Sequence, residues 1–434
     1  MSRRDQALWK APKDRRDPVD ITIESEEGRL PELLPIRHAR MAQSAFGFLR
    51  GSAAIMAADL GRTPSTGVNI QICGDCHLLN FGGFATPERV QIFDIHDFDE
   101  TAQAPWEWDL KRLATSFVVA GRHIRLRERD SQRAAFSVSQ AYREQMAEYS
   151  EMPVLDVWYD KIDVARFLKE APSEEFRERV QKRVERAREE ATAEHIFPKL
   201  VEGTRAKARI KDNPPLIYHI PSVQKRAEYT GSLERAIAEY RNSLPEHTRV
   251  LFDRFQYRDV AIKVVGVGSV GMMCMVALFT ASDEDALFLQ VKEARASVLE
   301  PYTGKSPYPN HGQRVVAGRR LMQAASDIFL GYSHGKLVGR DFYVRQLRDM
   351  KIKIMLEGAD PDLFRMYARI CGQGLARAHA RSGDAALLSG YMGSSHEFDD
   401  AIVEFSVAYA DQTERDYKAF LRAIRDGRLK IAEE

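Results

Sequence analysis

The chain has 434 residues, of which 44% are hydrophobic and 29% charged, so it can bury a sizeable core and is long enough for two or three packed subdomains. Its 64 Lys and Arg residues nearly balance its 63 Asp and Glu residues, which argues against a whole-chain nucleic-acid or membrane binder. Four cysteines are too few to imply a disulfide framework, and no apolar run is long enough to span a bilayer. The charged N-terminus lacks the apolar stretch of a secretory signal, so we expect a cytoplasmic protein.

Apolar spacing and turn residues predict the elements of the first third of the chain. In chain order these are a polar arm (1–30), an amphipathic helix (37–60), a strand (68–73), a loop (74–83), a second strand (90–94) and a helix (109–121). Gly61 and Pro64 mark the end of the first helix.

The rest of the chain is expected to be mainly helical over about 130–245 and rich in β-strands over about 260–291, followed by a helix (313–325), short strands (329–347) and helices to the end. We therefore predict an α+β fold class, with a large helical part plus a small antiparallel sheet domain. The predicted parts are a polar N-terminal arm (1–30), a mainly helical domain that carries the loop 74–83 (31–254), the small sheet domain (255–350) and C-terminal helices that pack on the helical domain (351–434).

An acid and an amide lie five positions apart on the loop after the first strand, at Asp75 and Asn80. This pair suits phosphoryl transfer, because the Asp can orient or deprotonate an acceptor hydroxyl and the Asn carbonyl can ligate Mg²⁺. The next strand leads to Asp94, Asp97 and Asp99. Clustered carboxylates are costly unless a cation is present, so we predict a magnesium site formed by Asn80 with acids of this group. The alternative is that these acids are turn or cap residues, since loops are rich in Asp.

His77 and His96 lie inside the acidic cluster. Mg²⁺ disfavours imidazole, so we expect both to be hydrogen-bonding partners, and His77 is also a candidate for direct participation in catalysis. Cys73 and Cys76 have CxxC spacing, but no second Cys/His pair lies nearby, so a closed zinc site is not expected. A redox role for this pair is the alternative.

Gly266, Gly268 and Gly271 have GxGxxG spacing between two apolar, strand-like runs. Glycine lets the backbone approach phosphates closely, so these residues and Ser269 are candidates for phosphate binding. A dinucleotide fold requires a helix after such a loop, but residues 272–280 are typical of a strand, so that interpretation fails. The alternative is a tight β-turn without a ligand.

Lys292 lies on the strand that follows, which gives the order glycine loop, strand, turn and lysine strand. A kinase has the same order, and its lysine contacts the nucleotide phosphates; the alternative is an edge-strand lysine. Arg50 follows an apolar helix face. It is either a phosphate contact or the partner of the acidic cluster in a buried ion pair.

Over nearly its whole length the chain resembles the DUF2252 family of uncharacterised bacterial proteins. The resembling segments are 48–51, 74–81, 93–100, 106–112, 345–351 and 375–384. The name of that family supplies no activity.

The segment around Asp75 is also similar to the catalytic loop and metal-binding turn of aminoglycoside and small-molecule kinases. That resemblance implies Asp75 as the catalytic base, Asn80 and Asp97 as metal ligands, and Asp109 at the start of the next helix. Asp94 is the competing metal ligand. It also implies a protein kinase-like two-lobed fold in permuted order, because the glycine loop and the lysine strand come after the catalytic loop.

A second departure from the kinase pattern is the helix 313–325, which lacks the Glu that normally pairs with the lysine. Glu293, Glu300 and Gln323 are the candidates to replace it. We predict a kinase-like phosphotransferase that uses ATP and Mg²⁺ to phosphorylate a hydroxyl of a small molecule or protein. The expected partners are a nucleotide and an acceptor, with no nucleic acid and no membrane. The alternatives are an AMP transferase on the same fold, a non-catalytic nucleotide-binding module and a metal-dependent hydrolase.

Overall fold

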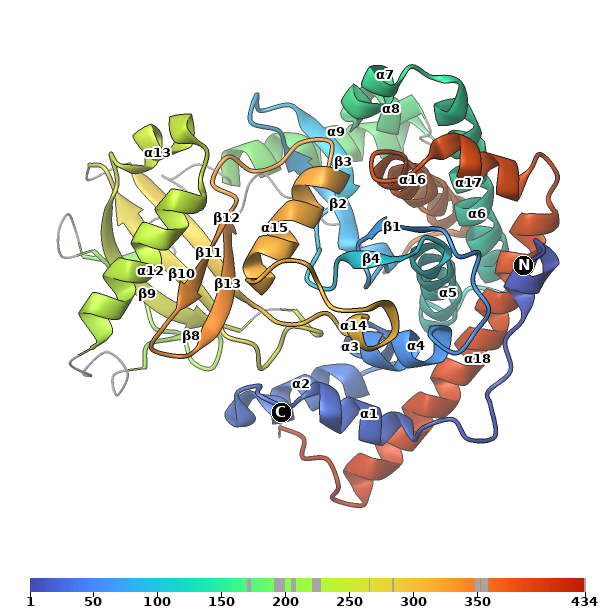
Figure 1. The fold of residues 1–434 in the computed structure, drawn as a ribbon, viewed down its shortest axis with the longest axis horizontal. Coiled ribbons are helices and arrows are strands. Elements are labelled where there is room, and N and C mark those ends of the chain that lie inside the picture. Colours follow the sequence, from blue (N-terminus) through green and yellow to red (C-terminus); the bar gives the residue numbers. More distant parts are fainter. Residues whose placement is uncertain are drawn as a thin grey trace.

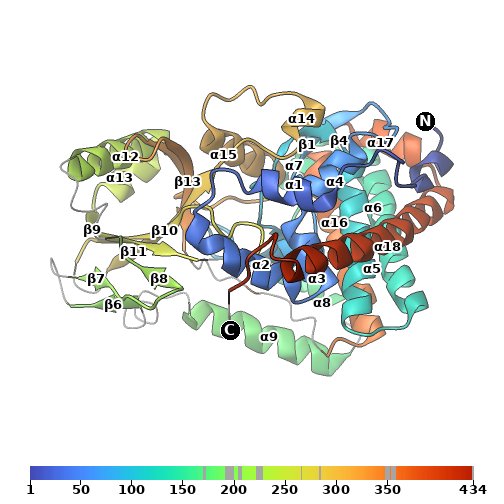
Figure 2. The ribbon, with the colours of Figure 1, turned by 90° about the horizontal axis from the view of Figure 1, so that it is seen from below.

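The computed structural model describes residues 1–169, 173–190, 200–203, 208–220, 228–264, 266–282, 285–347, 352 and 358–432. Residues 348–351, which belong to one of the segments that resemble the family, lie outside this part. The fold is α+β, as predicted, with about 52% helix and several small antiparallel sheets. Figures 1 and 2 show a part built around a twisted sheet beside a larger, mainly helical part. No helix in the described part is long and apolar enough to cross a membrane.

The largest sheet has six antiparallel strands. Their order across the sheet is β12 (Gly331–Gly335), β13 (Arg340–Gln346), β11 (Ala286–Ala294), β10 (Cys274–Thr280), β9 (Gln256–Lys263) and β8 (Ile217–Tyr218). Side chains alternate between its faces, so Leu287 and Leu289 pack with α12 (Tyr229–Ser243) and α13 (Glu246–Phe252). Phe288 packs on the opposite face, with β6 (Val201–Glu202) and β7 (Arg209–Ile210). Between β11 and β12 the chain forms α14 (Glu300–Thr303) and α15 (His311–Met322).

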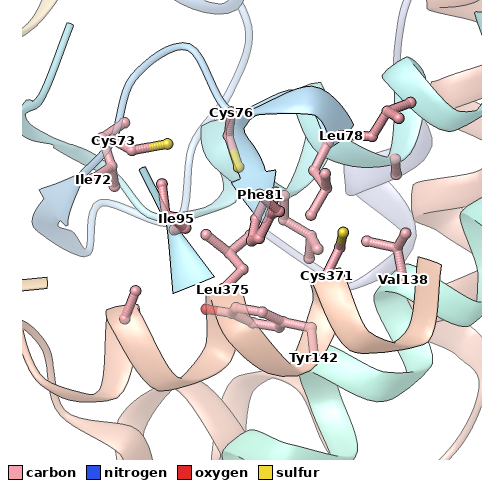
Figure 3. Packing of buried hydrophobic residues seen from close by; sticks show 14 of the residues in the cluster. Ile72, Cys73, Cys76, Leu78, Phe81, Ile95, Val138, Tyr142, Cys371 and Leu375 are labelled. Carbon is pink, nitrogen blue, oxygen red and sulfur yellow. The ribbon is translucent and has the colours of Figure 1, made fainter. Parts of the chain in front are cut away.

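The helical part is built on one large apolar core. Its helices are α5 (Glu107–His123), α6 (Glu128–Glu151), α7 (Val154–Tyr159), α8 (Val164–Lys169), α9 (Glu174–Glu190), α16 (Pro361–Ala380), α17 (Ala385–Met392) and α18 (Glu397–Arg425). Figure 3 shows Cys76, Leu78 and Phe81 lying against Tyr142 of α6 and Leu375 of α16. The segment that carries the first polar cluster is therefore anchored directly on the helical core.

The same segment forms two short antiparallel sheets. β1 (Asn69–Ile72) pairs with β4 (Ala102–Pro105), and β2 (Phe81–Ala85) pairs with β3 (Gln91–Ile95), which also meets β5 (Ile162–Asp163). A single 3₁₀ turn, η3 (Leu78–Asn80), links the loop after β1 to β2. The strands predicted at 68–73 and 90–94 agree with β1 and β3 to within one residue at each end.

The predicted polar arm, residues 1–30, contains two short helical elements, η1 (Arg4–Ala7) and α1 (Pro18–Ser25). They are followed by η2 (Pro31–Leu33), α2 (Leu34–Ala42), α3 (Ala45–Gly51) and α4 (Ala53–Leu60). Asp17 caps α1 by accepting from the Val19 amide, and Val19 is buried. The single helix predicted over 37–60 is split because Ser44 caps a new helix and Gly51 lies against Met41, where a β-carbon would come within 2.6 Å of that side chain.

Lys111 of α5 is buried among apolar residues, with Nζ 4.6 Å from the ring centre of Phe405. Burial, opposed only by Glu107, lowers the pKa of Lys111 from 10.5 to about 8. The unfolded chain therefore binds more protons than the folded chain between these values, so stability rises as the pH increases from about 8 to about 10. We expect Lys111→Met to be more stable than the wild type at pH 7, with a difference that shrinks by pH 10.

Urea unfolding at several pH values measures this difference. Lys418→Met on α18 is the matched control, because Lys418 is exposed and its replacement should give no pH-dependent change. A Lys111→Met protein that is less stable than the wild type at pH 7 would contradict the expectation.

Candidate functional site

A polar pocket lies where the sheet, the helical part and the N-terminal helices meet. Its volume is about 100 Å³. It brings together nine of the residues singled out in the sequence: Arg50, Asp75, His77, Asn80, Asp97, Asp99, Gly266, Gly268 and Ser269. Distant parts of the chain thus contribute to one site.

Asp75 lies on the loop after β1 and forms an ion pair with Arg112 of α5. Arg112 Nε donates to Asp75 Oδ1 at 2.6 Å, and Arg112 Nη2 donates to the Leu49 carbonyl at 2.8 Å. Burial raises the pKa of Asp75 to about 7, although Arg112 opposes this shift. A carboxyl with a pKa near 7 is suited to accept a proton at neutral pH.

The loop that holds Asp75, residues 73–80, is fixed by hydrogen bonds. Asp109 at the start of α5 accepts from the amides of Cys73 at 2.7 Å and Gly74 at 2.9 Å. Gly74 has φ of +84°, and a β-carbon there would come 2.3 Å from the Glu100 carbonyl, so this position requires glycine. Asn80 Nδ2 donates to the Asp75 carbonyl at 2.6 Å, which commits its amide group and leaves Oδ1 as its acceptor atom.

Lys292 reaches from β11 of the sheet to the acidic turn, which we define as residues 97–100. Its Nζ lies 2.6 Å from Asp99 Oδ2 and 3.8 Å from Asp97 Oδ2, and the Tyr343 hydroxyl donates to Asp99 Oδ1 at 2.7 Å. Burial opposes the charged form, but Asp97 and Asp99 outweigh it and raise the pKa of Lys292 well above its usual value. The ammonium offsets the charge of this turn.

None of the three residues considered as partners of Lys292 is bonded to it among the described contacts. Glu293 accepts from Arg340 at 2.6 Å, and Gln323 donates to the Ile95 carbonyl at 2.6 Å. Glu300 has a buried oxygen without a hydrogen-bond partner in the described structure. The acidic turn supplies the counter-charge that we expected from a helix.

The glycine-rich loop, residues 266–271, closes one side of the pocket. Gly266 and Gly271 have φ of +71° and +87°, a conformation that favours glycine. Arg29 Nη1 donates to the carbonyls of Gly268 at 2.8 Å and Val270 at 2.7 Å, and Arg37 Nη1 donates to the Gly268 carbonyl at 2.9 Å. Two arginines of the N-terminal segment therefore hold the backbone of this loop in place.

Arg29 and Arg37 also line the pocket, although neither was predicted from the sequence. Arg37 is 1% exposed and is paired with Glu26, with 3.1 Å between Nε and Oε1. The sequence did contain a sign of the role of Arg37, because this residue lies four positions before Met41 and so on the apolar face of the predicted helix. A charged residue on a buried face needs a partner, and here the partners are Glu26 and the carbonyls of the glycine-rich loop.

The structure does not bring Asp94 into the pocket. Its side chain is fully buried and accepts from Arg377 Nη2 at 2.7 and 2.8 Å and from the Ala324 amide at 2.9 Å. Gly271 does not line the pocket either; its α-carbon faces the side chain of Arg29. Lys292 is 3% exposed and is also not a lining residue, but it is bonded to Asp99, which is.

His77 lines the pocket and is only 5% exposed, and its Nδ1 has no hydrogen-bond partner among the described residues. Burial, with the nearby charges of Arg50 and Arg112, lowers the pKa of His77 well below its usual value, so the ring is neutral. A neutral imidazole nitrogen facing a polar pocket is an available hydrogen-bonding group.

Cys73, Cys76 and Asp109 place one possible metal ligand each within 4.8 Å of one another. Burial raises the pKa of both thiols, to about 11 for Cys76, so both are protonated at neutral pH without a metal ion. Asp109 is already bonded to two backbone amides. We therefore assign this group a structural role in the loop that holds Asp75.

These features define an α+β protein with a polar, two-sided pocket between a sheet and a helical core, acidic on one wall and basic on the other. The chain belongs to the family described as "Uncharacterized protein conserved in bacteria (DUF2252)", whose model matches residues 29–423. The family resemblance drawn from the sequence motifs is confirmed by this match. No curated protein and no solved structure matches the chain.

Proposed function

We propose that this protein is a phosphotransferase that uses ATP and Mg²⁺, with a kinase-like two-lobed arrangement in permuted order. One observation carries the proposal: Lys292 of the sheet lies 2.6 Å from Asp99, and the glycine-rich loop lines the same pocket as Asp75 and Asn80. Phosphoryl transfer depends mainly on positioning and on charge stabilisation, and these are the groups that provide both.

The order of elements in the sheet supports this function. The glycine-rich loop joins β9 to β10, and β11, which carries Lys292, pairs with β10. In kinases a glycine-rich loop covers the phosphates and a lysine two strands later contacts them. Backbone amides of the loop and the Lys292 ammonium would hold the phosphates of ATP.

The oxygen groups of the acidic turn fit a magnesium ion. Asp97 is 34% exposed and lines the pocket together with Asn80, whose Oδ1 is its acceptor atom, so these two would hold the ion. Bound Mg²⁺ would neutralise the charge that develops on the transferred group. Asp99 has both oxygens bonded, to Lys292 and Tyr343, so its role is to position Lys292.

Asp75 is the group placed to accept the proton of the acceptor hydroxyl, and Arg112 fixes its orientation.

Isothermal titration with ATP, with and without Mg²⁺, tests the proposal. We expect Mg²⁺-dependent binding that Lys292→Met weakens by at least about tenfold, or about 1.4 kcal/mol. Lys336→Met is the matched control, because Lys336 is exposed in the turn between β12 and β13 of the same sheet. Thermal unfolding of each variant shows whether its fold is retained.

Binding that is independent of Mg²⁺, or a Lys292→Met protein that binds as the wild type does, would contradict the proposal. The mass of a product formed with ATP separates the two transfer reactions, because phosphoryl transfer adds a phosphate and AMP transfer adds a nucleotide.

A further inference from the structure

Two arginines on the N-terminal wall of the pocket, Arg29 and Arg50, form no ion pair within the described part of the chain, whereas Arg37 pairs with Glu26 and Arg112 with Asp75. Arg29 donates to the carbonyls of Ser25, Gly268 and Val270, so much of its hydrogen-bonding capacity is used. Arg50, unlike Arg29, Arg37 and Arg112, has neither an ion pair nor a side-chain hydrogen bond among the described contacts.

Arg50 lies in the last turn of α3, half-buried, with its guanidinium carbon 5.9 Å from the ring centre of Phe46. Its Nε is buried and has no hydrogen-bond partner in the described structure. It lines the pocket next to Asp75 and His77, and its charge acts on both of them. The sequence left two roles open for Arg50, a phosphate contact or a buried ion pair with the acidic cluster. The described contacts contain no such ion pair.

A half-buried guanidinium without a counter-ion is costly, and an anion that supplies bidentate acceptors removes that cost. Asp75 and Asp97 act on Arg50 through their charge, but neither forms an ion pair with it among the described contacts, because Asp75 Oδ1 is bonded to Arg112 and Asp97 Oδ2 lies 3.8 Å from Lys292 Nζ. The planar fork of an arginine matches carboxylate and phosphate groups. The chemistry of this corner of the pocket therefore calls for an anion from outside the chain.

The position of Arg50 assigns that anion to the acceptor rather than to the nucleotide. Under the proposed function, on which this inference rests, the nucleotide phosphates lie between the glycine-rich loop, Lys292 and the acidic turn. The backbone carbonyl of Arg50 borders Gly268 of the glycine-rich loop, but the charge of its side chain acts first on Asp75 and His77, beside the group to which the acceptor hydroxyl gives its proton. Gly51, Ala53 and Ala54, which follow Arg50 in the chain, also line this small pocket.

We propose that the acceptor is a small hydroxyl compound with a carboxylate or phosphate group, and that Arg50 binds this group and so determines acceptor specificity. In the reaction the acceptor oxygen forms a bond with the γ-phosphorus. The bond from that phosphorus to the bridging oxygen breaks, and its electron pair leaves with ADP. The hydroxyl proton passes to Asp75.

Calorimetry on the full chain tests this with probes that do not require the acceptor to be known. The protein is first saturated with Mg²⁺ and a non-hydrolysable ATP analogue, so that the nucleotide phosphate positions are filled, and is then titrated with inorganic phosphate, glycerate or uncharged glycerol. We expect the two anions to bind and glycerol not to bind. Arg50→Gln should weaken anion binding at least about tenfold, while the affinity for the analogue changes less than about threefold.

Arg50→Lys keeps the charge and should retain part of the anion binding, which separates loss of charge from loss of fold. Arg62→Gln is the control for an Arg-to-Gln change, because Arg62 pairs with Asp14 on the surface away from the pocket. Three results would overturn this inference but not the proposed function. These are anion binding that Arg50→Gln leaves intact, binding of glycerol equal to that of the anions, and a loss of analogue binding that parallels the loss of anion binding. A wild-type protein that does not bind the analogue would remove the proposed function as well.

Discussion

Replacing Asp75 by Asn is expected to lower the turnover of phosphoryl transfer by about 10²–10⁴-fold, the usual contribution of a positioned general base. The affinity for Mg²⁺ and ATP should change little, because Asp75 contacts neither in the proposed arrangement. The fold should also be retained, since an Asn oxygen can still accept from Arg112 Nε. Formation of ADP under saturating ATP, with the acceptor that gives the highest wild-type rate, measures the effect.

Asp160→Asn is the matched control for this substitution. Asp160 is also half-buried and paired with an arginine: its side chain is 21% exposed and that of Asp75 is 22% exposed. It accepts from Arg166 at 3.0 Å and does not line the pocket. Its replacement should leave turnover unchanged. A protein with Asp75→Asn that keeps more than a tenth of the wild-type rate would show that Asp75 is not the base.

Groups of the pocket that lie close together in the sequence could be predicted from the sequence alone. Asp75 and Asn80 lie on one short loop, and the hairpin of β2 and β3 leads directly to the acidic turn. The glycine-rich loop and Lys292 are likewise set by two adjacent strands, since Cys274 pairs with Lys292 across β10 and β11. Such patterns are visible because each is contained within one supersecondary unit.

Contacts between distant segments could not be predicted in the same way. Spacing alone left Asp94 and Asp97 as competing candidates, and it could not show that Asp94 is paired with Arg377, which is 283 residues away. The same holds for Arg29, whose role under the glycine-rich loop depends on a carbonyl 239 residues away. Sequence periodicity shows which face of an element is buried, but not which charge from another element meets it.

The partner of Lys292 illustrates how a familiar pattern can mislead. In kinases a Glu of the following helix pairs with this lysine, whereas Lys292 is bonded to Asp99 of the acidic turn. The physical requirement is a counter-charge for a buried ammonium, and several arrangements can meet it. In this chain one lysine offsets two carboxylates and holds the sheet against the helical part.

The largest loss of stability is expected from Arg377→Met. Arg377 and Asp94 are both fully buried, so removing the guanidinium leaves a carboxylate without its counter-charge in the core. Breaking such a pair by removing one partner typically costs about 3–5 kcal/mol of the free energy of unfolding. Urea unfolding measures this loss, and Mg²⁺-dependent ATP binding by the folded fraction should be unchanged, because Asp94 does not line the pocket.

The same helix provides the control and the companion variant. Arg369 pairs with Glu144 on the surface of α16 and α6, each side chain 38% exposed, so Arg369→Met should cost less than about 1 kcal/mol. Arg377 Nε and Nη1 are buried without hydrogen-bond partners in the described structure, so the pair is not fully compensated. Removing both charges, as Arg377→Met with Asp94→Asn, should therefore recover at least about 1 kcal/mol relative to Arg377→Met alone. If the double variant is no more stable than the single one, the loss comes from packing around Arg377 and not from an uncompensated charge at Asp94.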